Sequence, residues 1–321
     1  MTTRRTTLLG LAGLAAAALA GAALPAAAAD FPSRPITVIV PFSPGGYTDN
    51  VARVIAQAIE DNELLSEPLV IVNMGGGGGA AAYAKLMSSP KDGETIMLWQ
   101  YNALIAKVLG IGRFDIDDIV SLGSTGETSP LWAVGPDSGL TSFADIEARL
   151  KEEPGSLIEV GGIGTIAQFA GAGLQQAAGI STRFVNGNSG ADRQRMLLGG
   201  NADISLFSPA EVMGNDQLKP VASFAPERSE QLPDVPTVSE LGYPDATWVN
   251  PMWWMAPAGI PQEAIDTLSE AFEKAVATPE VKQFFETYGD KAVFVDGPET
   301  TARARERLTA IEATAEQMRK P

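Results

Sequence analysis

The chain has 321 residues, and its 39 acidic and 23 basic side chains give a formal net charge of −16 at pH 7. Such acidity argues against nucleic acid or anionic lipid as a partner. The sequence contains neither His nor Cys, which removes the usual Ser-His-Asp and Cys-His nucleophile systems and nearly all zinc sites. We therefore expect no enzyme, no metal and no cofactor, with carboxylate or lysine chemistry as the only catalytic route left open.

The N-terminus has the order of an export signal. Arg4 and Arg5 precede a run of Leu, Ala and Gly over residues 8–24, Pro25 ends that run, and alanines stand before Asp30. A charged, an apolar and a small-residue segment in this order indicate a signal peptide, here residues 1–29.

The paired arginines favour the twin-arginine export route, with Thr7 standing where Phe is usual. The alternative is a membrane anchor, but residues 8–24 are short and weakly apolar for a span of about 20 residues. Cleavage after Ala29 leaves 321 − 29 = 292 residues, and the loss of two arginines changes the charge from −16 to −18. We therefore expect a periplasmic or otherwise extracytoplasmic protein with two lobes.

The first part of the mature chain alternates apolar strands with helices. Residues 36–40 are a continuous apolar run, as expected for a buried parallel strand. A helix is expected from Asp49, because apolar residues then recur on one helical face. Further strands are expected at 69–72 and 95–99, with a helix over 80–87 between them. Units of this kind predict an α/β fold with a mostly parallel sheet.

A second set of strands and helices begins after Pro130. Ser142 is a good N-cap for a helix over 143–151, Thr165 precedes another helix, and a third covers 192–198. Strands are expected at residues 131–134, 157–160, 183–185, 202–207 and 219–224. The C-terminal part is expected to be helical apart from one strand at 292–295.

Four strand-to-helix loops share one design. Each leaves the carboxyl end of a strand and enters a helix N-terminus, where free N–H groups and the helix dipole favour an anion. Ligands of open α/β sheets collect at this edge. One such loop alone is most simply a tight connection, but four of them, two in each half, favour a shared anion site. The four loops are residues 41–49, 73–79, 161–165 and 186–190.

Nucleotide motifs match these loops poorly. Residues 162–167 fit a loose G-x-G-x-x-A pattern, but no acid closes the following strand at 183–185. The glycines of 75–79 lack the Lys-Ser/Thr ending of a phosphate loop. The S-x-x-K spelling at 88–91 contains Pro90, which blocks the helix that this motif needs.

Several motifs stand in a fixed order along the mature chain: VPFSPGGYTD at 40–49, GIGT at 162–165, GGNAD at 199–203, LPDVPT at 232–237 and WMAPAGIP at 254–261. In this order they resemble the extracytoplasmic receptors of tripartite tricarboxylate transporters, the TctC or Bug family, along essentially the whole mature chain. The resemblance implies a type II periplasmic-binding-protein fold, in which two α/β lobes close on a small carboxylate. Lobe 1 is then expected to comprise residues 30–131 plus 249–321, and lobe 2 residues 132–248.

The resemblance also implies a role and partners. The protein is expected to deliver its ligand to two integral-membrane transporter subunits and to act as a monomer. Some receptors of this kind serve a membrane signalling system instead, and a periplasmic enzyme based on Asp49 or Asp203 is a further alternative. In the receptor reading, the ligand bridges the lobes and shifts an open–closed equilibrium.

In this family the first loop and the loop at 161–168 bind the carboxylate, largely through backbone amides and waters. Three departures leave the ligand open between di- or tricarboxylates and aromatic carboxylates: Tyr47 where Gly is frequent, Gln168 for His, and Met74-Gly75 for Arg-Pro. Tyr47 and Tyr101 are also the aromatic residues best placed to line a pocket. The candidate ligand-binding residues are Phe42, Ser43, Gly45, Gly46, Tyr47, Thr48, Asp49, Tyr101, Asn102, Gly162, Gly164, Thr165, Gln168, Asn188, Ser189 and Ser208.

Overall fold

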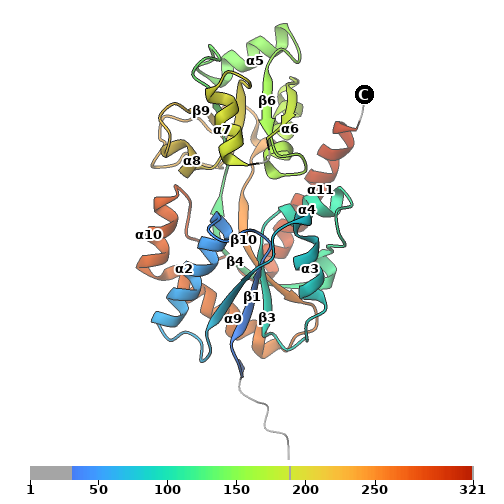
Figure 1. Ribbon diagram of the computed structural model, residues 1–321, viewed down its shortest axis with the longest axis vertical. Helices are drawn as coiled ribbons and strands as arrows, with labels where there is room; N and C mark the ends of the chain where they lie inside the picture. Colours follow the sequence, from blue (N-terminus) through green and yellow to red (C-terminus); the bar gives the residue numbers. More distant parts are fainter. Residues whose placement is uncertain (1–30, 188, 320–321) are drawn as a thin grey trace, which may run out of the picture.

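The computed structural model describes residues 31–187 and 189–319, so the expected export signal and Asn188 lie outside the described residues. The described chain forms two lobes, each built on a five-stranded sheet covered by helices (Figure 1). The expected α/β fold with two lobes is therefore confirmed.

The sheet of lobe 1 has the order β2-β1-β3-β10-β4. Strand β1 (Ile36–Val40) pairs in parallel with β2 (Leu69–Asn73) and with β3 (Thr95–Trp99). Strand β10 (Asn250–Pro257) pairs antiparallel with β3 and with β4 (Ile119–Thr128).

The sheet of lobe 2 repeats this arrangement in the order β7-β6-β8-β5-β9. Strand β6 (Ile158–Gly161) pairs in parallel with β7 (Arg183–Asn186) and with β8 (Ile204–Phe207). Strand β5 (Leu131–Val134) pairs antiparallel with β8 and with β9 (Lys219–Ser223). Both sheets are thus half parallel and half antiparallel, and the expected mostly parallel sheet is wrong.

The sequence did not predict two long strands, β4 and β10. Strand β4 has no alternation of apolar and polar residues. Its sequence IVSLGSTGET places polar residues inside the sheet, where two of them accept indole N–H groups from β10. Ser121 Oγ accepts from Trp253 Nε1 at 2.9 Å, and Thr125 Oγ1 accepts from Trp254 Nε1 at 2.8 Å. Buried polar groups are tolerated when they are paired in this way.

The strand expected at 292–295 is also wrong. That segment makes only isolated antiparallel bridges to β4, between Ser124 and Val295 and between Glu127 and Lys291. A four-residue apolar run is too short a pattern to distinguish a strand from an extended segment that packs on a sheet.

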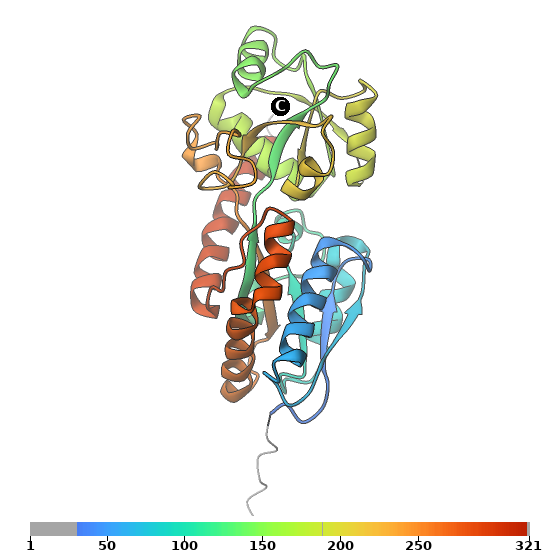
Figure 2. The same ribbon diagram turned by 90° about the vertical axis from the view of Figure 1, so that its left-hand side faces the viewer.

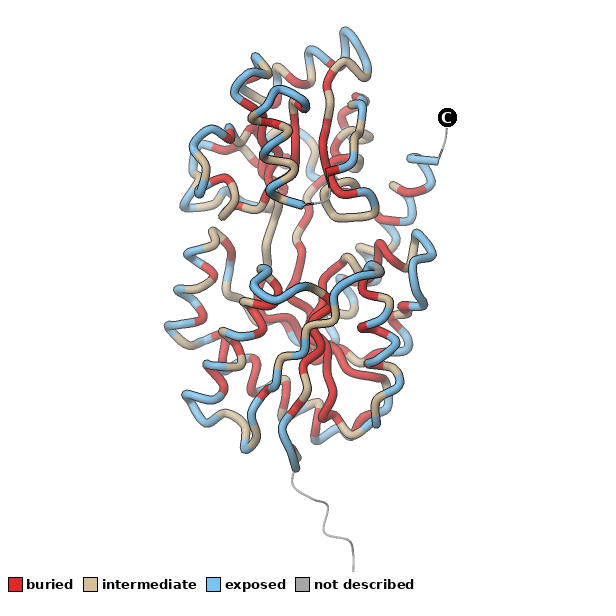
Figure 3. The backbone as a smooth tube through the Cα atoms, in the orientation of Figure 1, coloured by how far each residue is buried: buried red, intermediate tan, exposed pale blue. Residues whose placement is uncertain are grey.

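Helices cover both faces of each sheet, and buried residues fill the centre of each lobe (Figure 3). The helices of lobe 1 are α2 (Tyr47–Asp61), α3 (Ala80–Met87), α4 (Asn102–Val108), α9 (Gln262–Ala277), α10 (Pro279–Thr287) and α11 (Gly297–Met318), with 3₁₀ turns at Gly77–Gly79 and Ile116–Asp118. Trp254 on β10 stacks on Phe272 of α9 with the ring centroids 4.3 Å apart, and both rings are fully buried.

The helices of lobe 2 are α5 (Phe143–Glu152), α6 (Ile166–Ala178), α7 (Gly190–Leu198) and α8 (Pro209–Met213), with a 3₁₀ turn at Pro244–Ala246. The expected cap is confirmed, because the Ser142 side chain accepts a hydrogen bond from Asp145 N at the start of α5.

The chain crosses between the lobes twice, from β4 to β5 and from the segment after β9 back into β10 (Figure 1). Leu131, which was expected to be the last residue of the first segment of lobe 1, pairs with Phe207 in the sheet of lobe 2. Helix α11 adds a third link, because it packs on β4 and α4 of lobe 1 and also on α6 of lobe 2. Figure 2 shows this helix running alongside both lobes.

Candidate functional site

The parallel strands of both lobes end on the side where the lobes face each other, and the helices that follow them start there (Figure 1). The four glycine-rich loops therefore meet between the lobes. Direct contact supports this placement: a Cβ built on Gly164 of lobe 2 would lie 3.0 Å from Leu109 Cδ1 of lobe 1.

The loop between β1 and α2 is shaped by Asp49. Asp49 Oδ2 accepts hydrogen bonds from Gly45 N at 2.8 Å and from Arg53 Nε at 3.0 Å. Asp49 Oδ1 accepts from Asn73 Nδ2 at 2.9 Å and from Arg53 Nη2 at 3.0 Å. Burial raises the pKa of this carboxyl, but the hydrogen bonds from Arg53, Gly45 and Asn73 outweigh it and lower the pKa to about 2. Asp49 therefore stays ionised near neutral pH, and its hydrogen bonds fix the conformation of the loop.

Helix α2 begins without a side-chain cap. Its N-cap is Gly46, which has no side chain to accept from the first turn. The preceding residues Ser43 and Gly45 are exposed, with Gly45 at φ +79°, while Thr48 is buried and its Oγ1 accepts from Gln100 Nε2 at 3.0 Å. The first-turn amides of α2 are thus available to an anion.

Tyr47 is the first residue of α2, not a loop residue as expected. Its hydroxyl donates to Asp290 Oδ2, and its ring packs on Phe284 and on Tyr288, with centroid distances of 6.4 and 5.1 Å. Burial raises the pKa of the phenol well above its usual value. The side chain is engaged with α10 and the turn that follows it.

The loop between β6 and α6 in lobe 2 is also held by side chains. Ile163 N donates to Asn186 Oδ1 at 3.2 Å, and Gly164 N donates to Gln168 Oε1 at 2.9 Å. Thr165, the N-cap of α6, directs its hydroxyl to Gly162 O at 2.7 Å and makes no cap hydrogen bond. The first turn of α6, like that of α2, therefore lacks a side-chain cap.

Two other helices that start between the lobes, both in lobe 2, are capped. Ser189 Oγ accepts from Asp192 N at 3.1 Å at the start of α7. Ser208 and Glu211 form a reciprocal capping box at the start of α8. The hydroxyls of Ser189 and Ser208, both candidate ligand residues, thus already accept hydrogen bonds from backbone N–H groups at helix N-termini. Among the helices that follow parallel strands, α2, α3 and α4 in lobe 1 and α6 in lobe 2 have no side-chain cap.

Two asparagines that were not among the candidate residues hold the glycine-rich loops. Asn73 is the last residue of β2 and donates to Asp49 and to Phe42 O, at 2.9 and 3.2 Å. Asn186 is the last residue of β7 and accepts from Ile163 N. Each strand lies beside the strand that feeds the loop in its own lobe. The signal in the sequence is an Asn that ends a strand just before a Gly-rich loop.

Tyr101 and Asn102 follow β3 at the start of α4, which packs on the turn Gly77–Gly79 of the second loop. Tyr101 is buried at the N-cap of α4, its amide donates to Asn250 Oδ1 at 3.2 Å, and burial raises its pKa to about 12. It lines a cavity of about 680 Å³ together with Arg303 and Arg307 of α11. Asn102 begins α4, and its Oδ1 is buried without a hydrogen-bond partner.

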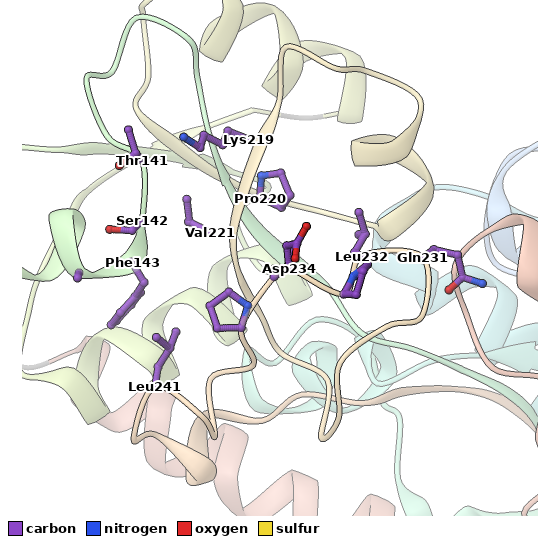
Figure 4. Close-up of a pocket in the computed structure, with 14 residues that line it drawn as sticks. Thr141, Ser142, Phe143, Lys219, Pro220, Val221, Gln231, Leu232, Asp234 and Leu241 are labelled. Atoms are coloured by element: carbon purple, nitrogen blue, oxygen red, sulfur yellow. The ribbon is translucent and has the colours of Figure 1, made fainter.

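Two further cavities also lie away from the four loops. One of about 510 Å³ is inside lobe 2, between the start of α5, strand β9 and the segment 231–236 (Figure 4). The other, of about 480 Å³, lies where the two lobes join and is lined in part by Asp290 and Lys291.

The four loops carry no cationic side chain, because residues 41–49, 73–79, 161–165 and 186–190 contain no Lys or Arg. Arg53, which follows the first loop, is paired with Asp49. Across residues 31–187 and 189–319, no cluster of three or more carboxylates is arranged to hold a metal ion. Within the same ranges no helix has the length and apolar character needed to cross a bilayer.

Sequence comparison assigns most of the chain to one family. The profile described as "Tripartite tricarboxylate transporter family receptor" matches residues 51–317. Protein BugT of Bordetella pertussis is 30% identical over 293 residues, which cover 88% of this chain and 89% of BugT.

Solved structures of similar fold include two from Rhodopseudomonas palustris. Rpa4515 with adipate has a TM-score of 0.78 at 20% identity and covers 89% of this chain and 98% of its own. MatC with bound malate has a TM-score of 0.74 at 22% identity and covers 88% of this chain and 99% of its own. At these identities the likeness shows the fold.

Proposed function

The chain belongs to the tripartite tricarboxylate transporter receptor family, and we propose that it is an extracytoplasmic solute receptor for a small carboxylate. The ligand binds between the lobes and is delivered, by a monomeric receptor, to a carrier with two integral-membrane subunits. The export signal expected at residues 1–29 supports a location outside the cytoplasm.

The observation that carries this proposal is that an uncapped helix N-terminus follows a Gly-rich loop in each lobe, α2 in lobe 1 and α6 in lobe 2. Each presents free N–H groups and the positive end of a helix dipole, equivalent to roughly half an elementary charge. A carboxylate held by both ends contacts both lobes at once, so its binding favours the closed arrangement. The malate and adipate named for the two R. palustris proteins are small carboxylates, which supports the class of ligand.

The two carboxylates considered for an enzyme have structural partners. Asp49 is bonded to Arg53, Asn73 and Gly45, and its low pKa makes it a poor base near neutrality. Asp203 Oδ2 accepts from Ile158 N at 2.7 Å, which ties the start of β8 to β6. These contacts favour a receptor over a carboxylate-based enzyme.

A ligand screen on residues 30–321 tests the proposal. Thermal shift with mono-, di- and tricarboxylates, aromatic acids and amino acids comes first, followed by calorimetry on each hit. A ligand present at 100 times its dissociation constant adds about 2.7 kcal/mol to the free energy of unfolding. If no carboxylate raised the melting temperature while an amino acid or sugar did, the proposal would be wrong.

A further inference from the structure

Three large apolar side chains are exposed where the two lobes face each other. Ile163 lies in the loop between β6 and α6 and is 66% exposed. Leu109 and Ile111 follow α4 in lobe 1 and are 38% and 41% exposed. Exposed aliphatic residues beside a binding loop indicate a surface that an apolar group can cover.

Close contacts place these side chains among the binding loops. A Cβ built on Gly164 would lie 3.0 Å from Leu109 Cδ1 and 4.0 Å from Ile111 Cδ1. A Cβ built on Gly78, in the loop between β2 and α3, would lie 3.0 Å from Ile111 Cγ2. Leu109 and Ile111 therefore fill the space between a binding loop of lobe 1 and the binding loop of lobe 2.

Ile163 is kept exposed by its neighbours. Its own amide donates to Asn186 Oδ1, and the next amide, of Gly164, donates to Gln168 Oε1. Gly164 has φ +72°, a conformation that favours glycine. The loop backbone is thus fixed on both sides of Ile163, and the side chain is presented outward next to the uncapped start of α6.

The charges around the loops limit how many carboxylates a ligand can carry. No Lys or Arg lies in any of the four loops, and the chain as a whole is strongly acidic. The uncapped starts of α2 and α6 supply partial positive charge for one carboxylate each, or for a single one that they share. A third carboxylate would add negative charge that no Lys or Arg of the four loops offsets.

From the exposed aliphatic residues and the absence of cationic side chains from the four loops, we propose that the ligand carries one or two carboxylates on an unsubstituted hydrocarbon chain or ring. The hydrocarbon part packs on Ile163, Leu109 and Ile111, and these three residues select against hydroxylated tricarboxylates. This inference rests on the proposed function, because it concerns the same site.

A ladder of linear dicarboxylates from succinate to suberate, together with malate and citrate, tests the inference by calorimetry. Burial of one methylene is worth about 0.8 kcal/mol, so affinity is expected to rise about fourfold per added methylene until the chain outgrows the site. Malate and citrate are expected to bind more weakly than the hydrocarbon diacid of best length.

Substitution then assigns the selectivity to the three side chains. Ile163→Ser and, separately, Ile111→Ser are expected to reduce the gain per methylene to less than twofold, with succinate affinity changed little. Val70→Ser is the matched control, because Val70 is an exposed aliphatic residue, 46% accessible, on β2 outside the loops. It is expected to leave the whole ladder unchanged.

The outcomes separate the two proposals. Tightest binding to citrate, or an equal loss for every acid in Ile163→Ser, overturns the hydrocarbon inference and leaves the receptor intact. The equal loss would mean that Ile163 acts only in lobe closure. Absence of binding to any carboxylate, in a protein that unfolds cooperatively, overturns the proposed function itself.

Discussion

The hydroxyl of Tyr47 donates a hydrogen bond to Oδ2 of Asp290, a residue 243 positions later in the chain. This bond joins the first residue of α2 to the turn after α10. Asp290 Oδ1 is buried without a partner. Burial raises the pKa of Asp290 to about 7, and hydrogen bonds with Tyr47 and Thr128 oppose the rise. The helix start proposed to bind the anion is therefore anchored to the C-terminal part of lobe 1.

Tyr47→Phe should destabilise the protein, because it removes the donor to a buried carboxyl and keeps the ring packing. The expected loss in the free energy of unfolding is about 1–3 kcal/mol, measured by urea denaturation at pH 7. Tyr243→Phe is the matched control, since Tyr243 donates at 2.6 Å to Glu147, which is more exposed and also paired with Lys151. An equal loss in both variants would contradict a special role for Asp290.

Two buried acids should make the protein less stable as the pH rises toward neutrality. Burial raises the pKa of Glu159 from 4.5 to about 7, although Trp132, Thr182 and Gln175 donate to its oxygens, and Asp290 rises from 3.8 to about 7. Each carboxyl has a higher pKa in the folded state than in the unfolded state. The stability that it contributes is therefore fully present below the unfolded pKa and is lost as the pH rises through about 7.

The absence of His from the sequence leaves few other groups that titrate between pH 5 and 7. Urea unfolding across this range is expected to show a decline in stability with rising pH. Glu159→Gln and Asp290→Asn should each flatten the decline, and the double variant should nearly remove it. A flat profile in the unsubstituted protein would refute the prediction.

Ile166→Pro should weaken carboxylate binding without unfolding α6. Ile166 is the first residue of that helix, where Pro is tolerated and no intrahelical N–H bond is lost. Thr165 before it is already extended, at φ −115° and ψ 171°, as Pro requires of its neighbour. Loss of one donor to a charged group costs about 1.5–3 kcal/mol, or roughly tenfold or more in affinity.

Ile166→Ala is the control for this substitution, because it removes the same side chain and keeps the amide. Calorimetry on both variants with the best ligand of the screen makes the comparison. Equal affinities would show that the first amide of α6 does not contact the ligand.

Gly126→Ala should destabilise lobe 1, because a Cβ on Gly126 would lie 2.2 Å from the Phe285 ring. Overpacking of a buried position costs about 1–3 kcal/mol. Gly173→Ala, in the middle of α6, meets no atom within 4 Å and should stabilise by about 0.5–1 kcal/mol. Thermal unfolding of both variants checks the opposite signs.

The sequence predicted those elements whose side-chain pattern is local. Strands β1, β3 and β5 and helix α3 begin and end at the expected residues, because apolar runs and turn residues define them. Strand β4 escaped prediction because its interior is built from Ser and Thr that receive indole N–H groups from Trp253 and Trp254. That pairing joins distant segments and leaves no periodic pattern.

The candidate site was predictable as a set of loops but not as a set of side chains. Glycines and strand ends predicted the loops that lead into α2 and α6, but not that these helices lack a side-chain cap. The direction taken by Tyr47 depends on Asp290, and the exposure of Ile163 depends on Asn186 and Gln168. Long-range contacts of this kind are set by the packed fold, so propensity and spacing carry no information about them.

Helix α11 has a practical consequence for anyone who labels this protein. Gln176 Nε2 of α6 donates to Thr314 O of α11 at 3.3 Å, near the C-terminal end of the helix. The other end of α6 is the proposed anion site. A C-terminal fusion that replaces or shortens α11 therefore removes a support of the ligand site. A fluorophore attached beside Thr314 lies at the contact between α11 and α6, outside the four loops.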